Sequence, residues 1–260
     1  MLRLLFSRQW WWTTLLVIAA VGVMARLGVW QLDRLAGRRA FNARVTGQQA
    51  QPPLVLSGAA LDADLSAMEY RAVTVVGQYD HAQQVALRNQ AWDDGQATAR
   101  VGVHLLTPLV IAGSDRAVLV DRGWIPQASA APEQWRQFDE PETVEVRGVI
   151  RRSQDRPDFG GVPDPAGHLL AWNLVNVERI DEQVPYALLP MYIQQSPDLT
   201  WTGLPYRITP KLDLSEGSHL GYAVQWFSFA VLLGVGYPFY VRSSTQRALA
   251  RQASRVSLSH

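Results

Sequence analysis

Two long apolar runs, one near each end of the chain, most constrain how this sequence can fold. They cover residues 10–31 (WWWTTLLVIAAVGVMARLGVWQ) and 218–241 (SHLGYAVQWFSFAVLLGVGYPFYV). A helix needs about 20 apolar residues to cross a bilayer, and both runs meet that length. Arg26 lies near the outer end of the first run, where its long side chain can reach the headgroups. We therefore predict two transmembrane helices, 10–31 and 218–241, which flank a domain at 32–217.

The short tails predict how the chain is oriented. Residues 1–9 carry two arginines and residues 242–260 carry four. Basic residues favour the cytoplasmic side, so both termini are predicted to be cytoplasmic. A cleaved signal peptide is the alternative for the first run, but its apolar core would be shorter. About nine residues before Trp10 are too few for a transit peptide. We expect a bacterial inner (plasma) membrane protein with a periplasmic domain.

The region between the runs has the pattern of an α+β domain rich in antiparallel sheet, which can curl into a barrel. Residues 32–47 are helix-compatible and continue the first helix. Tyr79–His81 is predicted to turn one hairpin, and Gly113–Asp115 a second. The expected strands are Arg71–Gln78, His81–Asn89, Val101–Ile111, Ala117–Val120, Val144–Arg151 and Met191–Gln195, and the expected short helices are Ala131–Phe138 and Val175–Gln183.

Composition excludes several classes of function. The formal net charge is +1, which gives no indication of a nucleic-acid partner. The chain has no cysteine, so it has no disulfide, Fe–S cluster, cysteine nucleophile or thiol-based copper site. No enzyme motif is present, and Asp93–Asp94 beside Gly95 is typical of a turn. We expect a protein that is not an enzyme.

His219 is the histidine with the most distinctive position, at the outer end of the second run. On a helix it shares a face with Tyr222, Ala223 and Trp226. A neutral imidazole between a small residue and aromatic walls can ligate haem iron. The alternative is an interfacial histidine near a helix start. Basic side chains that could meet haem propionates at the headgroup level are Arg34, Arg207 and Lys211.

Five segments, taken in order, resemble the Surfeit locus protein 1 family. They are GVWQLDRL at 28–35, VVGQYDH at 75–81, GVHLLTPL at 102–109, VLVDRGWIP at 118–126 and HLGYAVQWF at 219–227. Within them, we interpret Gly77, Asp80 and Gly123 as residues that determine the fold.

The resemblance implies an assembly factor for haem–copper terminal oxidases, which acts in cytochrome c oxidase biogenesis when haem a enters subunit I. It implies subunit I and other oxidase assembly factors as partners, besides the lipid bilayer. It also implies His219 as a haem a ligand, with Tyr222 and Trp226 as haem-facing residues. The alternative is a cofactor-free membrane adapter that stabilises an oxidase assembly intermediate.

Overall fold

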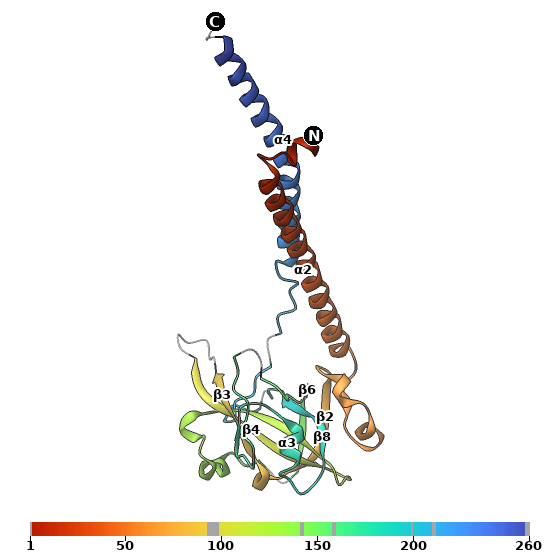
Figure 1. The fold of residues 1–260 in the computed structure, drawn as a ribbon. Coiled ribbons are helices and arrows are strands. Elements are labelled where there is room, and N and C mark those ends of the chain that lie inside the picture. Colours follow the sequence, from red (N-terminus) through yellow and green to blue (C-terminus); the bar gives the residue numbers. More distant parts are fainter. Residues whose placement is uncertain are drawn as a thin grey trace. The chain divides into compact units, whose positions relative to one another are not determined.

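The computed structural model describes residues 2–92, 99–140, 143–157, 160–198, 200–209 and 212–257 (Figure 1). Contacts divide the chain into two compact units. One combines the chain up to Ala43 with the chain from Asp213 onward, and the other is Arg44–Leu212. The predicted turn at Asp93–Asp94 lies outside the described residues.

Two long helices make up most of the first unit. After the short helix α1 (Leu2–Leu5), they are α2 (Trp11–Gln49) and α4 (His219–Ser257), which lie side by side in Figure 1. Each has 39 residues, or about 58 Å at 1.5 Å per residue, nearly twice the thickness of a bilayer core. Each predicted span is thus part of a longer helix, and its limits within the membrane stay a prediction.

Both helices expose large apolar side chains. Leu16 on α2 is 54% exposed and Leu232 on α4 is 69% exposed, and many apolar neighbours are similar. Water would oppose such continuous apolar surfaces, whereas lipid tails would solvate them. The two helices are long and apolar enough to cross a membrane.

The second unit is built on a mixed sheet whose order is β1-β2-β6-β8-β5-β4-β3-β7. An additional pairing of β2 with β4 closes β2, β6, β8, β5 and β4 into a five-stranded barrel. The strands are β1 (Leu54–Val55), β2 (Ala72–Tyr79), β3 (Val85–Trp92), β4 (Arg100–Ile111), β5 (Ala117–Pro126), β6 (Val144–Arg152), β7 (Ala171–Trp172) and β8 (Leu188–Gln195). The prediction of a sheet-rich, barrel-forming domain is confirmed.

The first predicted hairpin is wrong, because β2 and β3 do not pair with each other. Both lie along the same edge of β4: Tyr79 pairs with Leu109, whereas Val85 pairs with Leu106. Pro108, which has no N–H to donate, lies where the neighbour of β4 changes. The second hairpin, β4–β5, is confirmed, with a positive φ of 77° at Gly113 in its turn.

The short helices differ from their predicted form. Ala131–Phe138 contains the 3-10 helix η5 (Pro132–Phe138), and only Val177–Asp181 of the segment Val175–Gln183 is α-helical, as α3. Further 3-10 turns are η1 (Gly58–Asp62), η2 (Leu65–Met68), η3 (His81–Gln83) and η4 (Gln127–Ser129).

Apolar side chains fill the barrel and also cover its outside. Alternation along β5 sends Val118 and Val120 into the interior cluster, and Leu119 into a second cluster with Val177 and Ile180 of α3. A third cluster packs η5 onto β4 and β5 through Trp135 and Phe138. The strands are therefore buried on both faces, which explains their nearly continuous apolar sequence.

Two glycines within the resembling segments are required by the backbone. Gly123 has a φ of 118°, and a Cβ there would collide with the carbonyl oxygen of Tyr206. A Cβ on Gly77 would collide with the carbonyl oxygen of Val110, where β2 joins β4. Asp80 caps η3 by accepting a hydrogen bond from the N–H of Ala82. The interpretation of these three residues as fold determinants is confirmed.

Candidate functional site

His219 is the first residue of α4, and it contacts α2 directly. Its Nδ1 lies 2.8 Å from Oε1 of Gln31, so Nδ1–H donates to the amide oxygen. This bond fixes the ring and leaves Nε2 as the atom with a free lone pair. Histidines that ligate metals have this arrangement, in which the second nitrogen donates to a neighbouring oxygen.

The face of α4 that contains His219 and Ala223 packs against α2. Ala223 and Ala230 are buried, and a Cβ on Gly28 would lie 2.8 Å from the ring of Phe227. Small residues allow two membrane helices to approach closely. Ala223, the small residue on the predicted face of His219, contributes to this helix packing.

Tyr222 and Trp226 lie at the margins of this packing face. Tyr222 is exposed and Trp226 is partly buried, with its ring edge-on to Phe229 at 6.2 Å between centroids. Neither ring forms a wall beside the His219 imidazole among the contacts of the described residues. Their assignment as haem-facing residues stays a prediction.

Polar contacts hold the far end of the helix pair as well. The hydroxyl of Tyr237 lies 2.8 Å from that of Thr13 and 2.9 Å from that of Thr14. Hydrogen bonds between helices satisfy polar groups that lipid cannot. Together with the His219–Gln31 bond, these contacts join α2 and α4 by hydrogen bonds at both ends of the apolar segment over which the helices pack.

Beside His219, the first unit has a small pocket and an ionic contact. The pocket holds about 260 Å³ and is lined by His219, Asp33, Arg34, Gly37, Arg38 and Phe41. Next to it, Arg39 donates two hydrogen bonds of 2.8 Å to Glu216, which lower the pKa of that carboxyl. Residues leading into α4 are thereby attached to α2.

The surroundings of His219 fit an axial ligand but not an enclosed haem. A Cβ on Gly217 would stand 3.8 Å from Nε2, so glycine there leaves the ligating side of the ring open. A pocket of about 260 Å³ is smaller than the roughly 300–1,000 Å³ typical of small-molecule sites. Of the predicted propionate partners, Arg34 lines this pocket and Lys211 lies outside the described residues.

The third predicted propionate partner, Arg207, belongs to a buried ionic cluster in the second unit. Glu140 accepts hydrogen bonds from Arg122 at 3.1 Å and from Arg207 at 2.7 Å. Arg122 also donates to Gln84 at 2.8 Å, and its guanidinium lies over the ring of Tyr79 at 4.9 Å. Arg207 is buried and bound to Glu140, so the structure does not support a propionate role for it.

A second buried pair in this unit was not predicted. Nδ1 of His104 lies 2.9 Å from a carboxylate oxygen of Asp121. Burial lowers the pKa of His104, but the charge and hydrogen bond of Asp121 outweigh it and raise the pKa overall. The sequence pattern does not single out His104, and the structure shows that it belongs to a buried hydrogen-bonded pair with Asp121.

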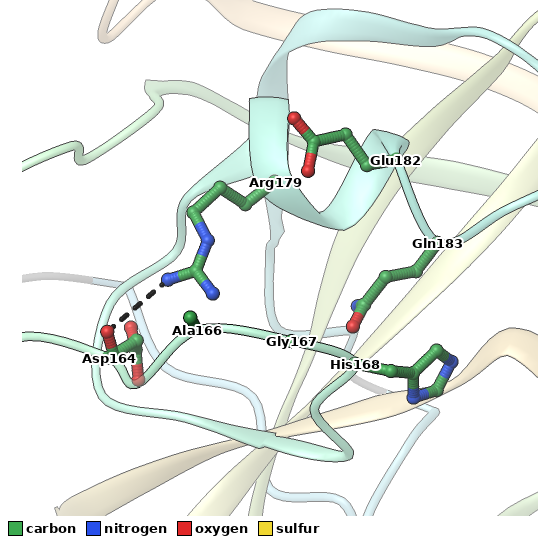
Figure 2. Close-up of a pocket in the computed structure, with 7 residues that line it drawn as sticks. All are labelled: Asp164, Ala166, Gly167, His168, Arg179, Glu182 and Gln183. Carbon is green, nitrogen blue, oxygen red and sulfur yellow. Dashed lines mark hydrogen bonds between the residues drawn. The ribbon is translucent and has the colours of Figure 1, made fainter.

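Figure 2 shows a surface pocket between the loop at Asp164–His168 and α3. Its polar groups already hold the loop in place: Arg179 donates to the carbonyl oxygen of Asp164, and Gln183 accepts from the N–H of Leu169. The carboxylate of Asp164 accepts from two further backbone N–H groups. The polar groups of this pocket are therefore already hydrogen-bonded to its walls.

Within the described residues, no group of three or more acidic, histidine or cysteine side chains could hold a metal ion.

Comparison with known proteins identifies the family. The model of the SURF1 family matches residues 18–231, which include more than half of each apolar run and the whole barrel. A SURF1-like protein of Monosiga brevicollis is 24% identical over 228 residues, 85% of each chain. A SURF1-like protein of Drosophila melanogaster is 28% identical over 78% of this chain and 69% of its own. Surfeit locus protein 1 of Gallus gallus is 25% identical over 77% of this chain and 66% of its own. The match covers well over half of the sequence, and the chain belongs to the SURF1 family.

Proposed function

We propose that this protein is a membrane-anchored assembly factor for a haem–copper terminal oxidase that carries haem a at His219 and assists its insertion into subunit I. Membership of the SURF1 family implies a role in cytochrome oxidase assembly. The observation that supports the finer role is the His219–Gln31 bond, which orients the ring with Nε2 available. The proposed role is not enzymatic.

In this proposal, the residues of the helix pair have separate tasks. His219 supplies the ligand, and Gln31 holds its ring in one orientation and tautomer. Arg34, which lines the adjacent pocket, provides positive charge at the level of the headgroups for carboxylates of the cargo. Arg38 beside it is already bound to Asp213 and Ser215. An open ligating side suits a carrier, because a bound group that is not enclosed can pass to a partner helix in the membrane.

The proposed location is a bacterial inner membrane, with both tails cytoplasmic and residues 32–217 periplasmic. Its support is the distribution of arginines and the exposed apolar surfaces of α2 and α4. The proposed partners are subunit I, other oxidase assembly factors and lipid.

The experiment is purification of the full chain in detergent from cells that make haem a, followed by visible spectra and haem quantification. Wild type should carry haem, His219→Ala should lose most of it, and His168→Ala should behave as wild type, because His168 is an exposed residue of the other unit. Stoichiometric haem in His219→Ala would refute the ligand assignment.

The cofactor-free adapter is favoured by one observation, the use of Ala223 and Ala230 in helix packing rather than in a haem cleft. The two functions separate in the same preparation. Wild type that copurifies with subunit I but never contains haem a would establish the adapter and reject the carrier.

A further inference from the structure

The pair of His104 and Asp121 borders a cavity on the outer face of the barrel. The cavity holds about 340 Å³, and four of its lining residues come from neighbouring strands: His104 of β4, Asp121 of β5, Arg151 of β6 and Tyr192 of β8. Strands of a closed barrel hold side chains at nearly fixed spacing. The cavity is therefore formed by rigid elements, and it belongs entirely to the second unit.

Asp121 is fully occupied in holding His104. Its carboxylate oxygens lie 2.9 and 3.0 Å from Nδ1, and one of them also accepts from the N–H of Gly123 at 3.0 Å. Within the described part of the chain, Nε2 of His104 has no hydrogen-bond partner, and the side chain lines the cavity. The charge and hydrogen bond of Asp121 favour the protonated imidazole by raising its pKa, and the Nε2–H of that ring is left to donate to an occupant.

Arg151 supplies a positive charge to the cavity, where it lies beside Tyr192. Its guanidinium lies 4.9 Å from the ring centroid of Tyr70, and its Nε is buried without a hydrogen-bond partner. Among the described residues, no acidic side chain forms an ion pair with it. A buried donor without an acceptor is costly, so an occupant that accepts a hydrogen bond would relieve it.

The remaining walls combine amides with apolar surface. Gln154 and Asn173 line one part of the cavity, and Leu87 and Val175 line another. This is the composition of a small-molecule site, in which apolar walls surround a few polar groups that fix orientation. The volume is near the lower limit of such sites, which restricts the occupant to a small molecule.

We propose that this cavity binds a small organic anion, with its carboxylate or phosphate group on Arg151 and Nε2 of His104 and its apolar part against Leu87 and Val175. The proposal is independent of haem a and of the helix pair. It adds to the barrel domain a site for a small anionic ligand.

The test compares benzoate with benzamide, which have the same shape but differ in charge. Each is titrated into the full chain in detergent, and the imidazole resonances of histidine-labelled protein are followed by NMR. Benzoate should bind saturably and shift the His104 signals, whereas benzamide should bind roughly tenfold more weakly or not at all. Arg151→Gln should weaken benzoate binding by roughly tenfold or more.

The matched control is Arg152→Gln, which removes the same charge from the next residue of β6, an exposed side chain outside the cavity. It should bind benzoate as wild type does. If Arg151→Gln fails to fold, the comparison of benzoate with benzamide on the wild-type chain still decides the proposal. Equal binding of benzoate and benzamide, unchanged binding in Arg151→Gln, or no saturable benzoate binding by wild type would overturn the proposal.

Discussion

The buried cluster around Glu140 allows a quantitative prediction about stability. Arg122 is 0% exposed and the Glu140 side chain only 8%, and Arg207 is also buried. Glu140→Gln would leave two buried guanidinium groups without a carboxylate. Removing one partner of a buried ionic group costs about 3–5 kcal/mol. Both hydrogen bonds end on Oε1, and the glutamine oxygen in that place can still accept them, so we expect a loss near the lower limit, about 3 kcal/mol.

The assay is urea unfolding of the full chain in detergent, followed by tryptophan fluorescence and by circular dichroism of the sheet. With a slope of about 2 kcal/mol per molar urea, the midpoint should fall by about 1.5 M. Glu145→Gln is the matched control, because Glu145 is 47% exposed and pairs with Arg147, which is 78% exposed. Such a surface pair contributes about 0–1 kcal/mol. Equal midpoints for the two variants would refute the reasoning that burial makes Glu140 essential.

Three further outcomes are expected. Gly28→Val should push its side chain into the ring of Phe227 and separate α2 from α4. Because the chain has no native cysteine, a cysteine pair engineered into α2 and α4 should then crosslink less than in the glycine form, and unchanged crosslinking would contradict the packing. Gly123→Ala should destabilise the barrel by about 2 kcal/mol or more in the same urea assay, because its φ is 118°, and a wild-type midpoint would argue against this strain. Asp121 raises the pKa of His104 in the folded chain, so the pair stabilises the fold fully below the unfolded pKa of about 6.5. The free energy of unfolding should then decline as the pH rises through the folded pKa. A urea midpoint that increases over this range would exclude the pairing.

The sequence predicts the helices well because their signal is local and long. Both apolar runs are continuous, and the continuation of α2 past Gln31 follows from the helix-compatible residues after it. The β4–β5 hairpin is also local, with Gly113 in its turn. These elements depend on neighbours in the chain, which a single sequence displays.

The failed predictions depend on contacts between distant segments. Nothing near Tyr79 indicates that β2 turns away from β3 to pair with the end of β4. A register shift between Leu105 and Leu106 sets His104 diagonally across from Asp121, and the residue pattern does not reveal such a bulge.

The buried ionic cluster did have a signal in the sequence. Arg122 interrupts the apolar strand segment VLVDRGWIP, and a charge in a buried strand requires a partner. The partner itself, Glu140, lies beyond η5, and only the fold brings it to Arg122.

The closure of the barrel has a consequence for the order in which the domain folds and for its tendency to aggregate. Only three residue pairs join β2 to β4, and they link segments about 30 residues apart, so this seam should form after the local β4–β5 hairpin. Until it forms, β2 and β4 each present an unpaired edge to other chains. Amide protons at the seam should exchange with solvent sooner than those of the long β4–β5 ladder. A bulky residue at Gly77, which faces the carbonyl of Val110, would hold the barrel open and favour edge-to-edge aggregation over a stable monomeric fold.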